Sequence, residues 1–236
     1  MKVAVMQPYF FPYLGYYQLV KAVDTFVFFD DVNFIKRGWI NRNQLLEKNH
    51  GYLFSVPLSK VSQNQKIKDT ELCEFIKWRQ DFLKVIEHNY KKAPFFKQVH
   101  PWLADFLQSE SYQTISELAI GSVQATMKYL GIEKSYLKSS ELPYCKDQGT
   151  PAQDKILSIC ELLGANTYIN PRNGGPLYQK EGFSSKKIDL SFLCMNEVEY
   201  SQFSPESFVP YLSMIDVLMF NDPETIKQYL DQYTLN

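Results

Sequence analysis

The hydrophobic pattern of the chain begins with short apolar runs separated by a stretch of helical period. Lys2–Met6 and Thr25–Phe29 have the length of strands, and the second run holds the β-branched and aromatic residues typical of a fully buried strand. Between them, Gly15–Val23 has apolar residues at helical spacing. This order predicts two parallel strands joined by a right-handed crossover.

The rest of the chain continues this alternation, with a long helical stretch in its middle. Apolar residues recur at helical spacing through most of 71–130, and Gly131 is expected to end the last helix there. A later predicted helix, Pro151–Leu163, is expected to be capped by Thr150. The other predicted elements are three short strands, a C-terminal strand and a C-terminal helix, in order Tyr52–Val56, Tyr136–Ser139, Asn166–Asn170, Lys187–Leu193 and Val209–Met219.

These elements predict an α/β fold with a Rossmann-like, mainly parallel sheet. We expect one domain over residues 1–236, with a helical insertion at about 70–130. Ligands in such open sheets bind at the carboxyl ends of the strands. The loops after the first, second and fifth predicted strands are therefore the candidate site.

Composition and charge narrow the classes of function. The net charge of -1 gives no overall field that would attract nucleic acid or anionic lipid, so phosphate binding would need a local site. The four cysteines form no CxxC pair and the three histidines lie far apart, so we expect no structural zinc site and assign no metal ligand. No signal peptide or membrane-spanning run is evident, so we expect a cytoplasmic protein without membrane insertion.

Charged residues gather directly after the second predicted strand. Asp30 and Asp31 come first, and adjacent carboxylates at a strand end can accept a proton, bind an amine or hold a divalent metal. The following basic residues suit a phosphate or carboxylate. Together they favour a binding site for a ligand that carries both an amine and an anionic group. The alternative interpretation is a set of surface ion pairs. The candidate catalytic residues are Asp30, Asp31, Lys36 and Arg37.

The loop after the first predicted strand, QPYFFPYLGYYQLV, is rich in aromatic residues and begins with Gln7. Its Tyr13-Leu14-Gly15-Tyr16 resembles the His-x-Gly-His sequence of nucleotidylyltransferases and pantothenate synthetases, which implies a HUP/nucleotidylyltransferase-like fold. Tyrosine can bond a phosphate oxygen but cannot carry the charge of a protonated histidine. The loop either binds a ligand or forms a hydrophobic lid over the sheet, and the cofactor stays open, with ATP and Mg²⁺ as one choice.

Three long segments resemble the WbqC-like protein family. They are the run MQPYFFPYLGYYQLVKAVDTFVFFDDVNFIKRGWINRNQLL, the segment YKKAPFF, and the region from LGANTYIN through YSQF to LSMIDVLMFN. The resemblance implies a role in bacterial O-antigen or other surface-polysaccharide biosynthesis. It further implies transfer of glycine or another acyl unit onto an amino sugar.

The motif positions supply the candidate ligand-binding residues. Tyr200 and Gln202 share one face of a predicted strand, and Ser213 is interpreted as a helix cap because no histidine is evident as its base. Asn170 opens a polar loop that contains two glycines. The full set is Gln7, Tyr9, Tyr13, Gly15, Tyr16, Asn41, Arg42, Asn170, Gly174, Gly175, Tyr200, Gln202 and Asp216.

Three hypotheses for the function remain open. The first is an acyl- or aminoacyl-transferase that forms an amide on a nucleotide-linked amino sugar, with an amino-acid or acyl donor that is pre-activated, made with ATP, or carried on a charged tRNA. The second is a nucleotidyl- or glycosyltransferase-like enzyme that uses Asp30 and Asp31 with Mg²⁺. The third is a non-catalytic sugar-binding assembly factor. A homo-oligomer is compatible with each of them.

Overall fold

A six-stranded, mostly parallel sheet forms the centre of the protein. The computed structural model describes residues 1–62, 64–109, 112–147, 149–204 and 207–236. The sheet has the strand order β5–β2–β1–β6–β7–β8, and only the last pair is antiparallel. Its strands are β1 (Lys2–Met6), β2 (Thr25–Phe28), β5 (Ser135–Lys138), β6 (Thr167–Pro171), β7 (Asp189–Met195) and β8 (Tyr233–Leu235). The prediction of an α/β fold with a mainly parallel sheet is confirmed.

The strand order places a reversal of chain direction across the sheet between β1 and β6. From β1 the chain moves outward to β2 and β5, and it then returns to add β6 and β7 on the other side of β1. The first five strands therefore have the order of a Rossmann-like sheet, whose ligands bind at the carboxyl ends of the strands near this reversal.

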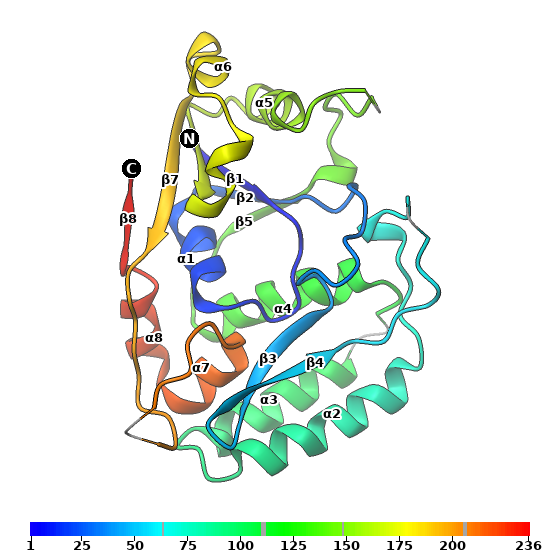
Figure 1. The fold of residues 1–236 in the computed structure, drawn as a ribbon, viewed down its shortest axis with the longest axis vertical. Helices are drawn as coiled ribbons and strands as arrows, with labels where there is room; N and C mark the ends of the chain where they lie inside the picture. Colours follow the sequence, from blue (N-terminus) through cyan, green and yellow to red (C-terminus); the bar gives the residue numbers. More distant parts are fainter. Residues whose placement is uncertain (63, 110–111, 148, 205–206) are drawn as a thin grey trace.

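Helices cover both faces of the sheet, which explains why its strands are apolar on both sides. Val3 and Val5 of β1 pack toward α5 and α6, whereas Ala4 packs toward α1 and α4. Figure 1 shows α5 and α6 above the sheet, with α1 and α4 on its other side. The bounds of these helices are α1 (Leu14–Ala22), α4 (Ile115–Tyr129), α5 (Ala152–Leu162) and α6 (Lys180–Ser185).

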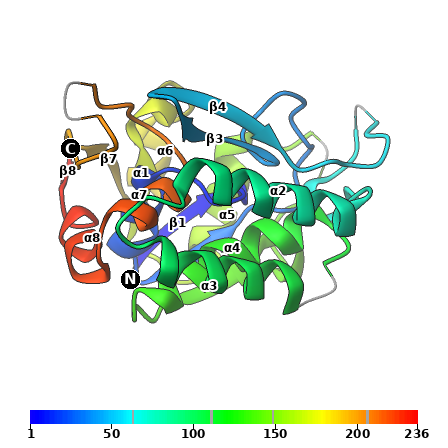
Figure 2. The same ribbon diagram turned by 90° about the horizontal axis from the view of Figure 1, so that it is seen from below.

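A hairpin and three helices lie between β2 and β5 in the chain. The hairpin strands, β3 (Arg42–Glu47) and β4 (His50–Ser55), pair with each other and not with the main sheet. Helices α2 (Phe75–Tyr90) and α3 (Phe96–Ser109) run side by side beneath this hairpin, as Figure 2 shows, and α4 follows them. The predicted strand Tyr52–Val56 therefore overlaps with β4, whose partner β3 the hydrophobic pattern did not indicate.

Several predicted boundaries were wrong for local reasons. Thr150 does not cap α5, because Pro151 occupies the cap position and makes no side-chain cap bond. β7 begins at Asp189 because Lys187 has a left-handed backbone, with φ of 59°. Residues 172–177, predicted as a polar loop, form a short 3-10 helix. The remaining short elements are 3-10 helices at Ile67–Asp69 and Ser139–Glu141, then α7 (Met214–Phe220) and α8 (Pro223–Tyr229).

The aromatic loop after β1 is largely part of the core. Phe10 and Phe11 are fully buried, and their rings meet aromatic side chains of β4, α2 and α3 edge to face. The N–H of Phe11 donates to the Ser122 hydroxyl of α4 at 2.9 Å. The loop thus ties the segment between β2 and β5 to the sheet.

Ser213 begins α7 and joins it to the same loop. Its hydroxyl donates to the carbonyl of Phe11 at 2.7 Å and accepts from the N–H of Ile215 at 3.3 Å. The predicted helix cap is confirmed, although α7 starts later than the predicted helix Val209–Met219.

Replacing Ser213 by alanine is expected to lower the free energy of unfolding by about 1–2 kcal/mol, because both buried bonds are lost. Urea unfolding followed by circular dichroism measures this change. Ser201→Ala, at an exposed position, is the matched control and should leave the midpoint unchanged. Equal stability of the two variants would show that the Ser213 hydroxyl is dispensable.

Candidate functional site

The pairing of β2 with β5 brings two remote polar segments together at the carboxyl edge of the sheet. Phe28 is the register partner of Lys138 at the end of each strand. Asp30, two residues beyond Phe28, therefore lies next to the serines of the 3-10 helix Ser139–Glu141. The aspartate pair therefore lies at the carboxyl edge of the sheet, as predicted.

Asp30 is buried, with only 2% of its surface exposed, and its carboxylate is fully engaged. One oxygen accepts from the Ser140 N–H at 2.9 Å and the Ser139 hydroxyl at 3.1 Å, and the other accepts from the Ser140 hydroxyl at 2.7 Å. The N–H of Lys68 also donates to the Asp30 carbonyl. A carboxylate held by so many donors fixes the turn after β5, so Asp30 is suited to a positioning role.

Asp31 lies closer to solvent than Asp30 and faces a cation. Its Oδ1 accepts from the Ser139 hydroxyl at 2.5 Å and from the Tyr144 hydroxyl at 2.8 Å. Its Oδ2 lies 3.3 Å from the ammonium group of Lys146, whose side chain is 41% exposed. Burial, and then the hydrogen bond to Asp31, raise the pKa of Tyr144, so its hydroxyl stays protonated and donates. Oδ2 is therefore the carboxylate oxygen that an incoming ligand can reach, by displacing Lys146.

A polar cavity of about 510 Å³ adjoins Asp30, the buried member of this pair. Asp30 and Ser140 form one wall, and the first turn of α4 contributes Glu117. Two lysines also line it, Lys68 from the segment before α2 and Lys138 from the end of β5. Each lies beside a carboxylate, and the bond from Lys68 to Asp69 raises the pKa of Lys68. The cavity thus offers ammonium groups that can bind phosphate oxygens next to the carboxylates.

The basic residues predicted to act with the aspartates have different positions. Lys36 and Arg37 are exposed on the turn after Asp31, and among the described residues their side chains form no hydrogen bond or ion pair with the aspartate pair. Arg42 donates to the carbonyls of Gly38 and Arg37, and its guanidinium lies over the Trp39 ring. These contacts explain the fold of the turn, and the proposed roles of these residues remain predictions.

Two further predicted ligand-binding residues, Asn41 and Gln7, differ in whether their side chains are hydrogen-bonded. The Asn41 amide donates to the Val56 carbonyl at 2.8 Å, which ties the start of β3 to the end of β4. Gln7 lies directly after β1, beside the reversal between β1 and β6. Its side-chain amide makes no hydrogen bond to the described residues, so it is available to a ligand.

Tyrosines of the first loop have mostly structural contacts. The buried Tyr16 donates its hydroxyl to the Gln7 carbonyl at 2.9 Å, and Tyr9 packs against the Tyr16 ring. The ring of Tyr13 lies over Gly15, where a Cβ atom would come within 2.5 Å of it. The Tyr13 ring therefore occupies the space that a side chain at position 15 would need, and the role of Gly15 in ligand binding remains a prediction. Burial raises the pKa of Tyr9 and of Tyr13.

The glycine-containing segment after β6 is closely packed. Asn170 is buried at the carboxyl end of β6, where its side chain accepts from the Tyr168 hydroxyl at 3.2 Å. Gly174 lies against the Asn170 amide so closely that a side chain could not fit, and Gly175 faces Phe192. Packing accounts for Gly174, whereas a Cβ atom at Gly175 would lie at an ordinary contact distance from Phe192. The role of both glycines in ligand binding remains a prediction.

The C-terminal candidates form a second, buried cluster around Asp216. One carboxylate oxygen accepts from Tyr90 at 2.7 Å, and the other accepts from Tyr200 at 2.6 Å and Gln202 at 3.1 Å. Tyr200 and Gln202 lie outside the described strands, so the predicted strand was wrong. Both side chains nevertheless contact Asp216. Burial raises the pKa of Asp216 to about 6, in spite of the three hydrogen bonds.

The sequence interpretation missed the residues that surround Asp30 and Asp31. They are Ser139, Ser140, Tyr144 and Lys146, all in or after the turn that follows β5. The predicted strand Tyr136–Ser139 carried the signal, because the loop after any parallel strand of the sheet belongs to the same edge.

Neither aspartate presents an open cation site. Both oxygens of Asp30 accept hydrogen bonds from serines, and Asp31 Oδ2 pairs with a lysine ammonium group. Among the described residues there is no group of three or more His, Cys, Asp or Glu side chains that could hold a metal ion. The residues present thus do not fit the Mg²⁺ considered from the sequence.

A family model described as the WbqC-like protein family matches residues 7–228. The chain belongs to this family. A curated relative, the uncharacterized protein Rv1507c of Mycobacterium tuberculosis, is 26% identical over 231 residues, which cover 97% of each chain. No solved structure matches the chain. In the described part of this WbqC-like protein, no helix has the length and apolar character needed to cross a membrane.

The region matched by the WbqC-like model includes both polar clusters. The aspartate pair and its serine partners lie within residues 7–228, and so do Tyr90, Tyr200 and Asp216. Of the two, only the aspartate pair combines a carboxylate near solvent with an adjoining polar cavity that lysines line. We therefore take the carboxyl ends of β2 and β5 as the candidate active site.

Proposed function

We propose that the protein is an N-acyltransferase of bacterial surface-polysaccharide (O-antigen) biosynthesis. It would form an amide between glycine, or a similar acyl unit, and the amino group of a nucleotide-linked sugar. The observation that carries this proposal is Asp31, a carboxylate with one oxygen toward an exposed ammonium group. Its neighbour Asp30 lines a cavity together with Lys68 and Lys138. Membership of the WbqC-like family supports the biosynthetic context.

The ion pair between Lys146 and Asp31 indicates that this carboxylate can bind an ammonium group. Lys146 is 41% exposed, and its ammonium group also donates to the Ser140 carbonyl at 2.9 Å and lies over the Tyr144 ring. The ammonium group of an acceptor sugar would take its place at Oδ2 and replace these contacts. The phosphates of the nucleotide would lie against Lys68 and Lys138 in the adjoining cavity. The amine and the anionic groups of one ligand would thus meet opposite charges in neighbouring places.

The chemistry then requires the loss of two protons from the nitrogen and one bond exchange. Asp31 Oδ2 takes the first proton from the ammonium group, and the neutral nitrogen attacks the carbonyl carbon of the activated acyl donor. The new C–N bond forms as the bond from carbon to the leaving group breaks, and the leaving group departs with its electron pair and takes up the second proton from the nitrogen. Tyr144 and Ser139 hold Oδ1, which keeps the carboxylate oriented. Asp30 positions the serines.

A product assay tests the proposal. Purified protein is incubated with a panel of UDP-, dTDP- and CDP-linked amino sugars and with glycine in several forms: with ATP and Mg²⁺, as a thioester, and on tRNA. Mass spectrometry should detect a glycyl amide with at least one combination. The matched sugars that carry a hydroxyl in place of the amine should give none. Absence of an acylated product across the panel, or equal acylation of the hydroxyl sugars, would contradict the proposal.

A further inference from the structure

A second cavity, of about 260 Å³, lies at the far side of the sheet from the aspartate pair. It opens after the end of β7, between the loop that follows this strand and the loop that leads into α7. β7 is three strands away from β2 in the sheet, which separates the two places by roughly 14 Å at the usual strand spacing. The cavity is therefore a site distinct from the candidate active site.

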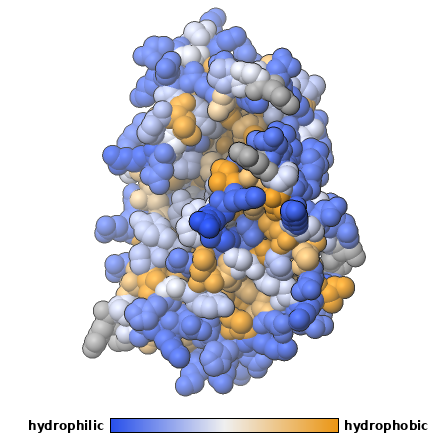
Figure 3. All heavy atoms as spheres, turned by 45° about the vertical axis from the view of Figure 1, so that its right-hand side comes forward, coloured by the Kyte–Doolittle hydropathy of each residue, from blue (hydrophilic) through white to orange (hydrophobic). Residues whose placement is uncertain are grey.

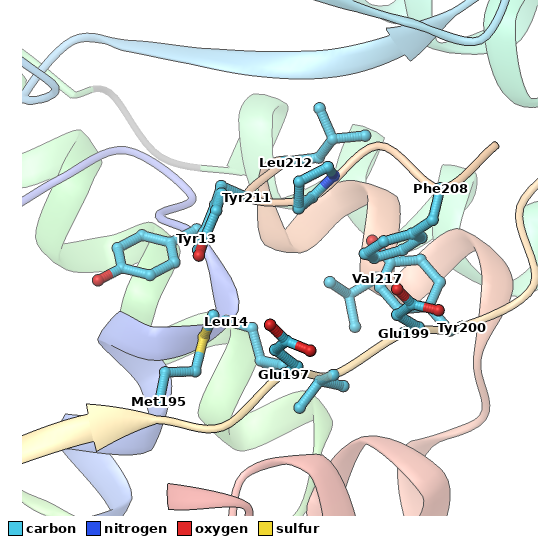
Figure 4. A pocket seen from close by; sticks show the side chains of 12 residues that line it. Tyr13, Leu14, Met195, Glu197, Glu199, Tyr200, Phe208, Tyr211, Leu212 and Val217 are labelled. Carbon is cyan, nitrogen blue, oxygen red and sulfur yellow. The ribbon is translucent and has the colours of Figure 1, made fainter.

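Aromatic rings form much of its wall. Tyr13 and Tyr211 meet edge to face, with ring centroids 6.1 Å apart, and Tyr200 and Phe208 do the same at 5.1 Å. Figure 4 shows the two pairs on opposite sides of the cavity. Tyr211 is 68% exposed and has a left-handed backbone, with φ of 58°, so its ring is presented at the opening and not packed in the core.

Two carboxylates complete the wall. Glu197 and Glu199 come from the loop after β7, and the Glu197 carboxylate points toward the middle of the cavity in Figure 4. Neither has a hydrogen-bond or ion-pair partner among the described residues. None of the twelve described residues that line the cavity is a lysine, arginine or histidine. The cavity thus has a net negative charge that the described lining leaves uncompensated.

We infer that this cavity binds a small organic cation through a protonated amine. Carboxylates accept hydrogen bonds from an ammonium group, and the faces of tyrosine and phenylalanine rings attract its charge. An inorganic ion such as Ca²⁺ fits less well, because it needs a shell of oxygen ligands. Apart from the two glutamates, much of the wall consists of aromatic rings, which supply no carboxylate or carbonyl oxygen. The volume lies just below the range of about 300–1,000 Å³ typical of drug-sized ligands, which favours a molecule of amino-acid size.

This inference stands independently of the proposed acyl transfer, because it uses none of the residues around Asp31. The candidate ligands share one chemical feature, a protonated amine on a compact neutral body. Glycinamide has this feature, and N-acetylglycinamide is its neutral counterpart with the amine blocked. The pair separates recognition of the charge from recognition of the amide.

Amide chemical shifts of the isotope-labelled full chain, measured during titration with each probe, test the inference. Glycinamide should shift the signals of residues 197–200 and 211–212, and N-acetylglycinamide should not. The double substitution Glu197→Gln, Glu199→Gln should weaken glycinamide binding about tenfold, while Glu133→Gln, an exposed glutamate before β5, should leave it unchanged. Tyr211→Leu should weaken binding as well, because one aromatic wall is lost. Equal binding of both probes, or undiminished binding by the double variant, would overturn the inference.

Discussion

Replacing Asp31 by asparagine is expected to lower kcat for the proposed acyl transfer about 100- to 10,000-fold, the usual range for loss of a general base. The amide keeps an oxygen for the hydrogen bonds from Ser139 and Tyr144, so the local structure should persist. It cannot take a proton from the acceptor amine at neutral pH. KM for the sugar nucleotide should change much less than kcat, because the cavity with Lys68 and Lys138 is unaltered.

Initial rates with the best acceptor from the product assay give both constants. Asp189→Asn is the matched control, because Asp189 is an exposed aspartate at the opposite, amino end of β7. It should keep the wild-type rate. A thermal melt of each variant checks that the fold is intact. A kcat for Asp31→Asn within about threefold of wild type would show that Asp31 is not the base.

The stability of the wild type relative to Asp216→Asn is expected to fall as the pH rises from about 4 to about 7. Burial raises the pKa of Asp216 from 3.8 to about 6, so the folded protein holds the proton more tightly than the unfolded chain in this window. Stability from this group is complete at the acid end and is lost as the pH rises through the folded pKa. The full loss is roughly 3 kcal/mol.

Urea unfolding of both proteins at a series of pH values measures this difference. The asparagine variant does not titrate at this position, so subtracting its free energy of unfolding isolates Asp216 from the other groups. Ser213→Ala supplies the control, because serine does not titrate in this window and its difference from wild type should be independent of pH. A difference for Asp216→Asn that stays flat, or that grows with pH, would contradict the assigned direction of the pKa.

The sheet and its flanking helices could be predicted largely from local patterns. β1, α1 and β2 are short apolar or periodic runs, and burial on both faces leaves a signal in every residue. The hairpin was harder, because β3 (Arg42–Glu47) begins with polar residues whose side chains bond to neighbouring backbone. The start of α7 was predicted too early, because Pro210 and Tyr211 continue the apolar pattern although they lie in a loop.

Only the aspartates of the candidate site could be predicted from the sequence. The aspartates follow a strand that is evident in the sequence, but their partners lie more than 100 residues later. Only the register of β2 with β5 brings Ser139 and Tyr144 to them, and no local pattern encodes that register. Likewise, Tyr90 reaches Asp216 from α2, across 126 positions of the chain. Such contacts follow from the order of strands and the packing of helices, which is decided by the whole chain.

Titration of the isotope-labelled protein with UDP-glucosamine tests most directly whether the carboxyl ends of β2 and β5 bind the acceptor. We predict that amide chemical shifts change around residues 29–31, 68 and 138–146, and that UDP-glucose, with a hydroxyl in place of the amine, shifts the signals near Asp31 less. Changes that spare these residues and gather elsewhere, or identical changes with both sugar nucleotides, would contradict the assignment of this edge of the sheet as the site that recognises the amine.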